Sequence, residues 1–241
     1  SMLPDASVVS GGLPCEGFSS SQLTDKKREE HPTGSLGFYF LKIVEHVRPA
    51  LVLIEEVPNF KNSAMAAMAR YVLSSLGYHV SETDLISSDF GSLSKRKRFC
   101  MVASINKPFV FSDELKIESN KIVSDILEYQ IDERVWLTKE DNKSIAYCLR
   151  SEQNHIEKGN GFRFSRTYID SKVTATITKG YFANRLTDPI LVHPDNPDMY
   201  SWFTPRELAR INGLPEDFIL PSTKSTAGEV IGQGICFEAF H

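Results

Sequence analysis

The chain has 241 residues, of which 41% are hydrophobic and 24% are charged, and its formal net charge is −4. This composition is typical of a soluble globular protein with one large domain, or one domain and a smaller one. The net negative charge excludes nucleic-acid binding through overall charge, so such binding requires a local basic surface. No apolar run approaches the roughly 20 residues that span a bilayer, and no basic-then-apolar signal segment occurs, so no membrane contact is expected.

The first predicted element is a short strand at residues 6–9, which delivers Cys15 to a tight loop of small residues at residues 11–19. A lone cysteine is more often a small buried hydrophobic residue than a nucleophile. In this loop, backbone N–H groups at a helix N-terminus would raise the thiolate fraction, whereas the adjacent Glu16 would lower it. The cysteines are far apart and form no C-x-x-C pair, which argues against a zinc site or disulfide framework and for a reducing compartment. They are Cys15, Cys100, Cys148 and Cys236.

The next elements alternate between helices and strands. The pattern predicts a helix at 36–47, a strand buried on both faces at 50–54, a helix at 65–76, and strands at 78–85 and 99–103. Asn62 or Ser63 is the expected N-cap of the second helix and Gly77 its terminator. This alternation predicts an α/β fold, with a sheet of parallel strands and helices packed on both of its faces.

Charged residues follow two of these strands. Glu55 and Glu56 end the buried strand, where α/β sheets bind ligands, although adjacent strand residues point to opposite faces. The basic run at 95–98 is consistent with a solvent-exposed loop or with a phosphate-binding site. In extended geometry Arg96 and Arg98 would point the same way and could together hold a phosphate or a carbonyl.

Beyond residue 107 the periodicity weakens. We expect a smaller irregular domain at 107–199 with short β-like pieces at 172–178 and 189–192. Order returns at Thr204, which begins a capping box with Glu207 and opens a short helix that Gly213 closes.

Five motifs in this order resemble those of the cytosine-5 DNA methyltransferase family. Residues 11–19 (GGLPCEGFS) resemble the nucleophile motif Gly-Gly-Pro-Pro-Cys-Gln-Gly-Phe-Ser, and Leu51 to Val57 resembles the strand that ends in Glu-Asn-Val. Residues 89–98 resemble Gly-x-Pro-Gln-x-Arg-x-Arg, 203–218 the penultimate motif, and 231–235 the last motif, Ile-Gly-Asn-Ala-Val. Each motif alone is moderately specific, whereas five in the family's order are a strong signal.

The resemblance implies a Rossmann-like methyltransferase sheet and a target-recognition domain. Residues 1–106 would then be the catalytic half of the methyltransferase domain, 107–199 the target-recognition domain, and 200–241 the return to the methyltransferase domain. It also implies transfer of a methyl group from S-adenosylmethionine to carbon 5 of a flipped-out cytosine, in restriction-modification. Cys15 would add to carbon 6, Glu55 would hold or protonate ring nitrogen 3, and Arg98, with Arg96, would bind the base carbonyl and orient Glu55.

The remaining site residues follow from the same resemblance. Double-stranded DNA is the expected partner, and the cofactor is S-adenosylmethionine, with no metal. The residues expected at the DNA are Ser19, Ser20, Ser21, Lys95, Lys97 and Thr176. Those expected at the cofactor are Pro14, Gly232, Gln233 and Gly234.

Several positions depart from the family pattern. Ser94 replaces Gln, Gln233 replaces Asn and Leu13 replaces Pro. Glu16 replaces Gln and Glu56 replaces Asn, and each is expected to put a negative charge where the family has a neutral amide. Charge of that sign near a phosphate backbone should weaken DNA binding.

The family's opening Phe-x-Gly-x-Gly loop and two further strands have no counterpart in this sequence. We therefore expect an incomplete methyltransferase sheet and an incomplete cofactor site. The isolated chain is expected to be inactive, and to self-associate or to need a complementing N-terminal chain. The expected location is the cytoplasm of a bacterium or its phage, or the nucleus of a eukaryote.

Two other functions remain open on the sequence alone. The changed amides and the missing cofactor motifs favour a non-catalytic DNA-binding or regulatory relative. A tRNA cytosine-5 methyltransferase is the other alternative, although the segment 107–199 is longer than expected for that branch. The sequence does not reveal the target site, because contacts from loops to base edges determine it.

Overall fold

The computed structural model describes residues 4–13, 34–117, 119–235 and 237–240, and these form two compact units. The first unit comprises the described residues within Ser1–Leu85 and Lys97–Glu114. The second unit comprises those within Ile86–Arg96 and Leu115–His241. In the part of the chain that the structure describes, no helix is long and apolar enough to cross a membrane.

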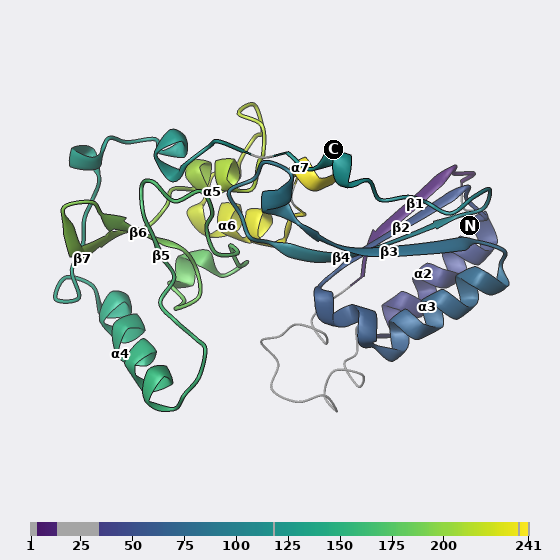
Figure 1. Cartoon of the computed structure of the whole chain (residues 1–241), viewed down its shortest axis with the longest axis horizontal. Helices are drawn as coiled ribbons and strands as arrows, with labels where there is room; N and C mark the ends of the chain where they lie inside the picture. Colours follow the sequence, from purple (N-terminus) through teal and green to yellow (C-terminus); the bar gives the residue numbers. More distant parts are fainter. Residues whose placement is uncertain (1–3, 14–33, 118, 236, 241) are drawn as a thin grey trace. The chain divides into compact units, whose positions relative to one another are not determined.

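A four-stranded sheet forms the centre of the first unit (Figure 1). Its strands are β1 (Val8–Gly12), β2 (Leu51–Glu56), β3 (His79–Ile86) and β4 (Lys97–Ser104), in the order β1-β2-β4-β3. The predicted strands at 6–9, 50–54, 78–85 and 99–103 are thus present, with ends shifted by one to three residues. β1 and β2 are parallel, as predicted.

The orientation of β4 corrects the expected parallel sheet, because β4 runs antiparallel to β2. β3 and β4 are neighbours in the sheet, joined by residues 87–96, which contain the short 3-10 helix η3 (Ser87–Asp89) and no α-helix. A parallel neighbour needs a crossover of about a dozen residues or more, usually a helix. This link is too short for such a crossover, so the sheet is mixed.

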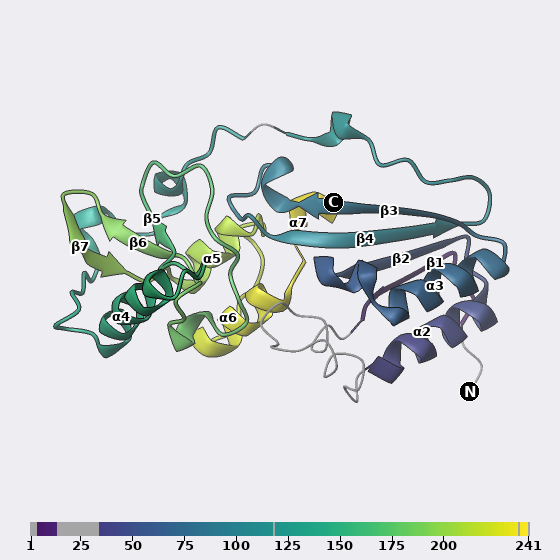
Figure 2. The same ribbon diagram turned by 60° about the horizontal axis from the view of Figure 1, so that its bottom comes forward.

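The helices α2 (Gly34–Val47) and α3 (Ala64–Ser75) both cover the same face of this sheet (Figures 1 and 2). The expectation of helices on both faces is therefore not met by the described helices of this unit. The 3-10 helix η2 (Pro58–Asn62) precedes α3, and the Ser63 side chain caps α3 by accepting a hydrogen bond from the Ala66 N–H at 3.1 Å. Gly77 follows α3 with a φ of +88°, which only glycine adopts readily, so the predicted cap and terminator are confirmed.

The second unit contains more elements, and most of them are short. They are η3 (Ser87–Asp89), η5 (Val123–Ile126), η6 (Ile131–Glu133), α4 (Lys143–Glu157), β5 (Arg166–Thr167), η7 (Tyr181–Ala183), β6 (Ile190–His193), β7 (Asn196–Ser201), α5 (Pro205–Ile211), α6 (Lys224–Gln233) and α7 (Phe237–Phe240). A further 3-10 helix, η4 (Asp113–Leu115), lies where the chain passes between the units. β6 pairs in parallel with β5 and antiparallel with β7.

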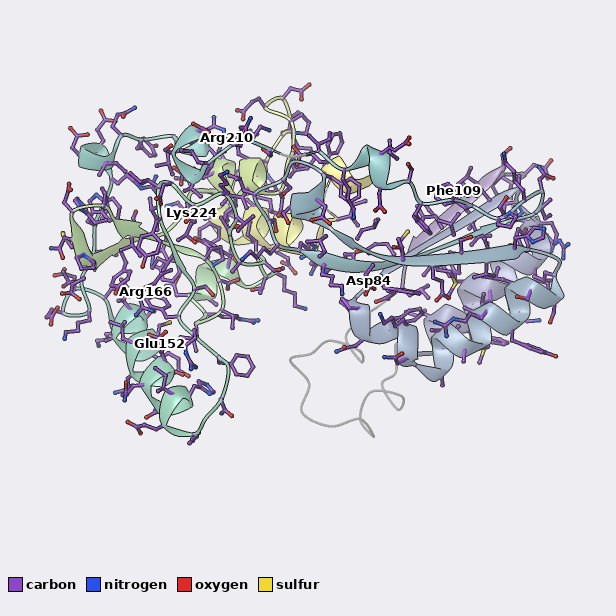
Figure 3. All side chains as sticks on the ribbon, in the orientation of Figure 1. Asp84, Phe109, Glu152, Arg166, Arg210 and Lys224 are labelled. Atoms are coloured by element: carbon purple, nitrogen blue, oxygen red, sulfur yellow. The ribbon has the colours of Figure 1, made fainter. Side chains whose placement is uncertain are left out.

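Helix α4 was not predicted from the sequence. It packs on the three-stranded sheet (Figure 2), where Ile145 and Cys148 share a core with Ile190 of β6 and Tyr200 of β7. Glu152 of α4 and Arg166 of β5 point toward each other (Figure 3), and their side chains form an ion pair at 2.9 Å.

The predicted β-like piece at 172–178 is wrong, whereas the piece at 189–192 is confirmed as β6. Thr174 makes one isolated bridge with Ser94, but the N–H of Thr178 donates to the Asp188 carboxylate at 2.9 Å instead of to a neighbouring strand. The short helix predicted after Thr204 is confirmed as α5. The Thr204 hydroxyl accepts from the Glu207 N–H, and the Glu207 carboxylate accepts from the Thr204 N–H.

Candidate active site

The end of β1 and the end of β2 lie side by side in the first unit. Gly12 is in register with Glu55, which is in register with Cys100 of β4. A Cβ placed on Gly12 would lie 3.6 Å from the Glu55 carboxylate oxygen Oε2. The nucleophile motif, which begins at Gly11, and the glutamate motif therefore reach the same edge of one sheet.

Glu55 forms an ion pair with Arg98 of β4. The Arg98 Nε lies 2.8 Å from Glu55 Oε1, and the two side chains are only 16% and 17% exposed. The Arg98 Nη1 also donates to the Lys97 carbonyl at 2.8 Å, which restrains the guanidinium. Partial burial strengthens such a pair relative to a surface ion pair, so the orientation of the Glu55 carboxylate is well defined.

Glu56 points to the opposite face of β2 and is only 2% exposed. Its Oε2 accepts a hydrogen bond from the Val57 N–H at 2.9 Å. Burial is the main cause that raises the pKa of Glu56 to about 8. Burial thus opposes the negative charge expected at this position.

Arg96 belongs to the second unit, whereas Glu55 and Arg98 belong to the first. Its guanidinium is buried and points at the carbonyl oxygens of Ile177 and Gln233, at 3.4 and 3.5 Å. Within the first unit, the structure brings Arg98 to Glu55. Within the second unit, it brings Arg96 to the segment after Thr176 and to α6.

The glycine-rich motif at 231–235 forms the end of α6, and Gly234 is the C-cap of that helix. A Cβ on Gly232 would lie 2.3 Å from the Thr178 carbonyl carbon, so only glycine permits this close approach. Gly234 lines an apolar pocket of about 400 Å³ together with Phe218, Ile235 and Phe237, among other residues.

Lys97, which was expected to face DNA, is already paired in the first unit. Its Nζ lies 2.9 Å from Asp84 Oδ2, and Lys61 Nζ lies 3.0 Å from the same oxygen; Asp84 is labelled in Figure 3. Burial acts to raise the pKa of Asp84, but the two lysines hold it below its usual value. Lys95 is in the second unit with an exposed side chain, and its N–H donates to the Thr174 carbonyl at 3.0 Å.

Thr176 is half-buried, and the residues after it are fixed by a carboxylate that the sequence did not single out. Asp188 is fully buried and accepts from both the N–H and the hydroxyl of Thr178, at 2.9 and 3.1 Å. Burial is the main cause that raises the pKa of Asp188. No sequence signal marks this residue, because the contact joins positions that only the fold brings together.

An open pocket of about 500 Å³ in the second unit was also missed. It lies between α4 and residues 183–187, and its lining includes Lys143, Tyr147, His155, Phe162 and Arg185. Tyr147 and Phe162 are both more than half exposed. Residues 143–188 carry eight Lys or Arg and four Asp or Glu, so this segment is basic in a chain that is acidic overall.

Several predicted site residues lie outside the described residues, namely Pro14, Cys15, Ser19, Ser20 and Ser21. Among residues 4–13, 34–117, 119–235 and 237–240, no group of three or more His, Cys, Asp or Glu side chains could hold a metal ion. The described cysteines Cys100 and Cys148 are free and buried, and burial is the main cause that raises their pKa values to about 12 and about 11.

Comparisons with solved structures identify the fold. The chain superimposes on the methyltransferase EhMeth of Entamoeba histolytica with a TM-score of 0.71 and 20% identity, covering 95% of this chain and 73% of that one. It superimposes on the Dnmt2 methyltransferase of S. pombe with a TM-score of 0.72 and 22% identity, covering 98% and 76%. Both are proteins with a methyltransferase fold, which this chain therefore shares.

Comparisons of sequence identify the family. The chain is 30% identical to the type II methyltransferase M.DsaV of Dactylococcopsis salina over 97% of its length, and 28% identical to M1.ScrFI of Lactococcus lactis subsp. cremoris over 99%. It spans 66% and 61% of the length of these two relatives. The family model for C-5 cytosine-specific DNA methylases matches residues 1–240. The chain belongs to the C-5 cytosine-specific DNA methylase family.

Proposed function

We propose that the protein is a DNA (cytosine-5-)-methyltransferase of a restriction-modification system, acting on double-stranded DNA with Cys15 as its nucleophile. The observation that carries this proposal is the meeting of three motifs at one sheet edge in the first unit. Gly12 of β1 is in register with Glu55 of β2, and Glu55 pairs with Arg98 of β4. Cys15 follows Gly12 by three residues, which span at most about 11 Å.

The chemistry requires carbon 5 of cytosine to become nucleophilic. The Cys15 thiolate adds to carbon 6, forming an S–C bond, while Glu55 holds or protonates ring nitrogen 3 and so stabilises the electrons displaced from the ring. Arg98 orients the Glu55 carboxylate and contacts the base carbonyl. Carbon 5 then accepts the methyl group, its proton leaves to a base, and the S–C bond breaks to regenerate the thiolate.

S-adenosylmethionine supplies the electrophilic methyl group when it is bound. We propose that Gly234 and the aromatic side chains of Phe218 and Phe237 receive its purine ring, because they line an apolar pocket of suitable size. The described lining of this pocket contains no charged side chain, so the amino-acid end of the cofactor is held elsewhere. Pro14, Gly232 and Gln233 are the other proposed cofactor residues.

DNA contacts are proposed for Lys95, Lys97, Thr176 and the serines 19–21, and the structure adds the pocket beside α4. Its Lys143 and Arg185 suit phosphate oxygens, and its exposed Tyr147 and Phe162 suit base or sugar surfaces. The basic segment 143–188 can thus attract DNA although the whole chain is acidic. The target base is inside a duplex, so binding must also offset the few kcal/mol needed to flip it out.

Transfer of a labelled methyl group tests this proposal. The protein is incubated, alone and with the complementing N-terminal chain expected from its sequence, with S-adenosylmethionine labelled in the methyl group and mixed-sequence duplex DNA. The DNA is then digested to nucleosides. We expect the label in 5-methylcytosine, and we expect Glu55→Gln to lose it. Label in tRNA but not in DNA would support the tRNA alternative. DNA binding without label even in the presence of the complementing chain would support the non-catalytic alternative.

A further inference from the structure

Glu56 occupies an apolar environment at the carboxyl end of β2. The alternating burial of β2 places it on the same face as Val52 and Ile54. Its cross-strand partner is Phe99 of β4, which is fully buried, and Phe99 packs against Phe60 of η2. These side chains, with those that α2 and α3 contribute, form the hydrophobic core of the first unit.

Among the described residues, no cation forms an ion pair with Glu56. The charged groups that act on it are Glu55 on the same strand, which disfavours ionisation, and Arg98 on β4, which favours it but forms its ion pair with Glu55. Lys61 of η2 and Arg70 of α3 are instead paired with Asp84 and Glu82 of β3. Burying an ionised carboxylate without a paired cation costs several kcal/mol, so such a group stays neutral.

The hydrogen bonds of Glu56 also suit a neutral acid. Its Oε2 accepts from the Val57 N–H, as the oxygen of an amide would. Its Oε1 is buried and has no hydrogen-bond partner among the described residues. A carboxylate would bury negative charge on an oxygen that no donor stabilises, whereas a carboxylic acid places only a neutral group there, as an amide does.

We propose that Glu56 is a protonated carboxylic acid that replaces an amide, positioning the backbone after β2 and leaving Glu55 as the sole negative charge at the end of that strand. Arg98 then has one carboxylate to orient rather than two. Ionisation of Glu56 places a second negative charge next to Glu55 and divides the attraction of the Arg98 guanidinium between them. Glu56 is thus a positioning residue. Its effect on methyl transfer rests on the proposed function, whereas its charge state does not.

The charge state is tested by the pH dependence of stability. The folded pKa of Glu56, about 8, lies above the ordinary value of 4.5, so its contribution to stability is complete below about pH 4.5 and is lost as the pH rises to 8. We expect the unfolding equilibrium constant of the wild type to rise about tenfold per pH unit relative to that of Glu56→Gln over this window. The measurement is urea unfolding of both proteins between pH 5 and pH 9.

Two further variants make this test decisive. Glu56→Asn, which restores the amide of the family motif, should behave like Glu56→Gln. Glu45→Gln is the matched control, because Glu45 is 52% exposed in a surface ion pair with Lys42, and its curve should parallel that of the wild type. Parallel curves for the wild type and both Glu56 variants would overturn the proposal. So would failure of both neutral variants to fold, since a neutral side chain is what the proposal requires.

The positioning role is tested by the pH profile of methyl transfer. Between pH 7 and pH 9 the protonated fraction of Glu56 falls about tenfold, so the wild-type rate should fall by up to that factor relative to the rate of Glu56→Gln. Identical profiles would contradict the positioning role. If neither protein methylates DNA, the proposed function fails, and the unfolding curves still decide the charge state of Glu56.

Discussion

The two units of this protein are stabilised in different ways. The core of the first is apolar side chains between a regular sheet and two helices, and Glu56 is the acid buried beside it. In the described part of the second unit, the strands are short and the connections long. Buried polar side chains link its segments through hydrogen bonds and ion pairs. Arg134 and Glu207 form an ion pair there at 2.5 Å, with side chains 2% and 0% exposed.

The difference shows how each unit positions its functional residues. In the first unit, strand pairing places Gly12 opposite Glu55. Arg98 lies two residues along β4 from Cys100, the cross-strand partner of Glu55, and from there its side chain reaches the carboxylate. In the second unit, side chains bonded to distant backbone set the positions, as Arg96 does for Ile177 and Asp188 for Thr178. Substitutions in the first unit should therefore separate chemistry from stability, whereas those in the second should change both.

The largest effect is expected from Glu55→Gln, which removes the proposed acid but keeps its shape. We expect the rate of methyl transfer to fall by about 10²–10⁴-fold, the usual contribution of a general acid or base. The melting temperature should fall only modestly, because Arg98 loses its carboxylate partner but Glu55 lies at a strand end outside the apolar core. The measurement is initial rate with labelled cofactor beside thermal unfolding of the same preparation. A variant that unfolds early would show that Glu55 is structural.

The second unit should respond to loss of its buried ion pair. Arg134→Met leaves the Glu207 carboxylate buried without its cation, which should lower the free energy of unfolding by about 3–5 kcal/mol. Replacing both partners by apolar residues, Arg134→Met with Glu207→Leu, should recover part of this loss. Urea unfolding measures both variants. Equal loss in the single and double variants would mean that the other hydrogen bonds of Glu207, to the N–H groups of Glu128 and Thr204, matter more than the pair.

A smaller effect is expected from the two lysines on either side of Arg96. Lys97 is paired with Asp84, whereas the Lys95 side chain is exposed. Lys95→Ala should therefore reduce the slope of log affinity against log salt by about one unit, and Lys97→Ala by less. DNA binding measured from low to moderate salt tests this. A larger change for Lys97 would mean that DNA displaces Asp84 from it.

Sequence patterns predicted most of the first unit. The spacing of apolar residues predicted α3 with its Ser63 cap. The motifs predicted that Glu55 and Arg98 act together, and in the structure their side chains form an ion pair. The direction of β4 was not predictable from its own residues, because it depends on the length and path of the link from β3.

The second unit was less predictable. Helix α4 was missed, although Asn142 is a regular N-cap whose side chain accepts from the N–H groups of Ser144 and Ile145. The helix is amphipathic but mostly polar, so few apolar residues mark it in the sequence, and it is stabilised by packing its apolar face on the sheet. The burial of Glu56 and Asp188 could not be predicted from the sequence either, since burial depends on neighbours that are distant in sequence. The sequence shows that Glu56 replaces the Asn of the family motif, but it does not show the charge state of the Glu56 carboxyl.

The central claim is that Cys15 attacks cytosine beside Glu55, and covalent trapping tests it most directly. The protein, together with the complementing N-terminal chain expected from its sequence, is incubated with S-adenosylmethionine and duplex DNA in which 5-fluorocytosine replaces cytosine, because fluorine at carbon 5 cannot leave as a proton does. We predict a protein–DNA adduct that survives denaturation, maps to the peptide containing Cys15, is absent in Cys15→Ser and persists in Cys148→Ser. An adduct that forms equally well with Cys15→Ser would contradict the account.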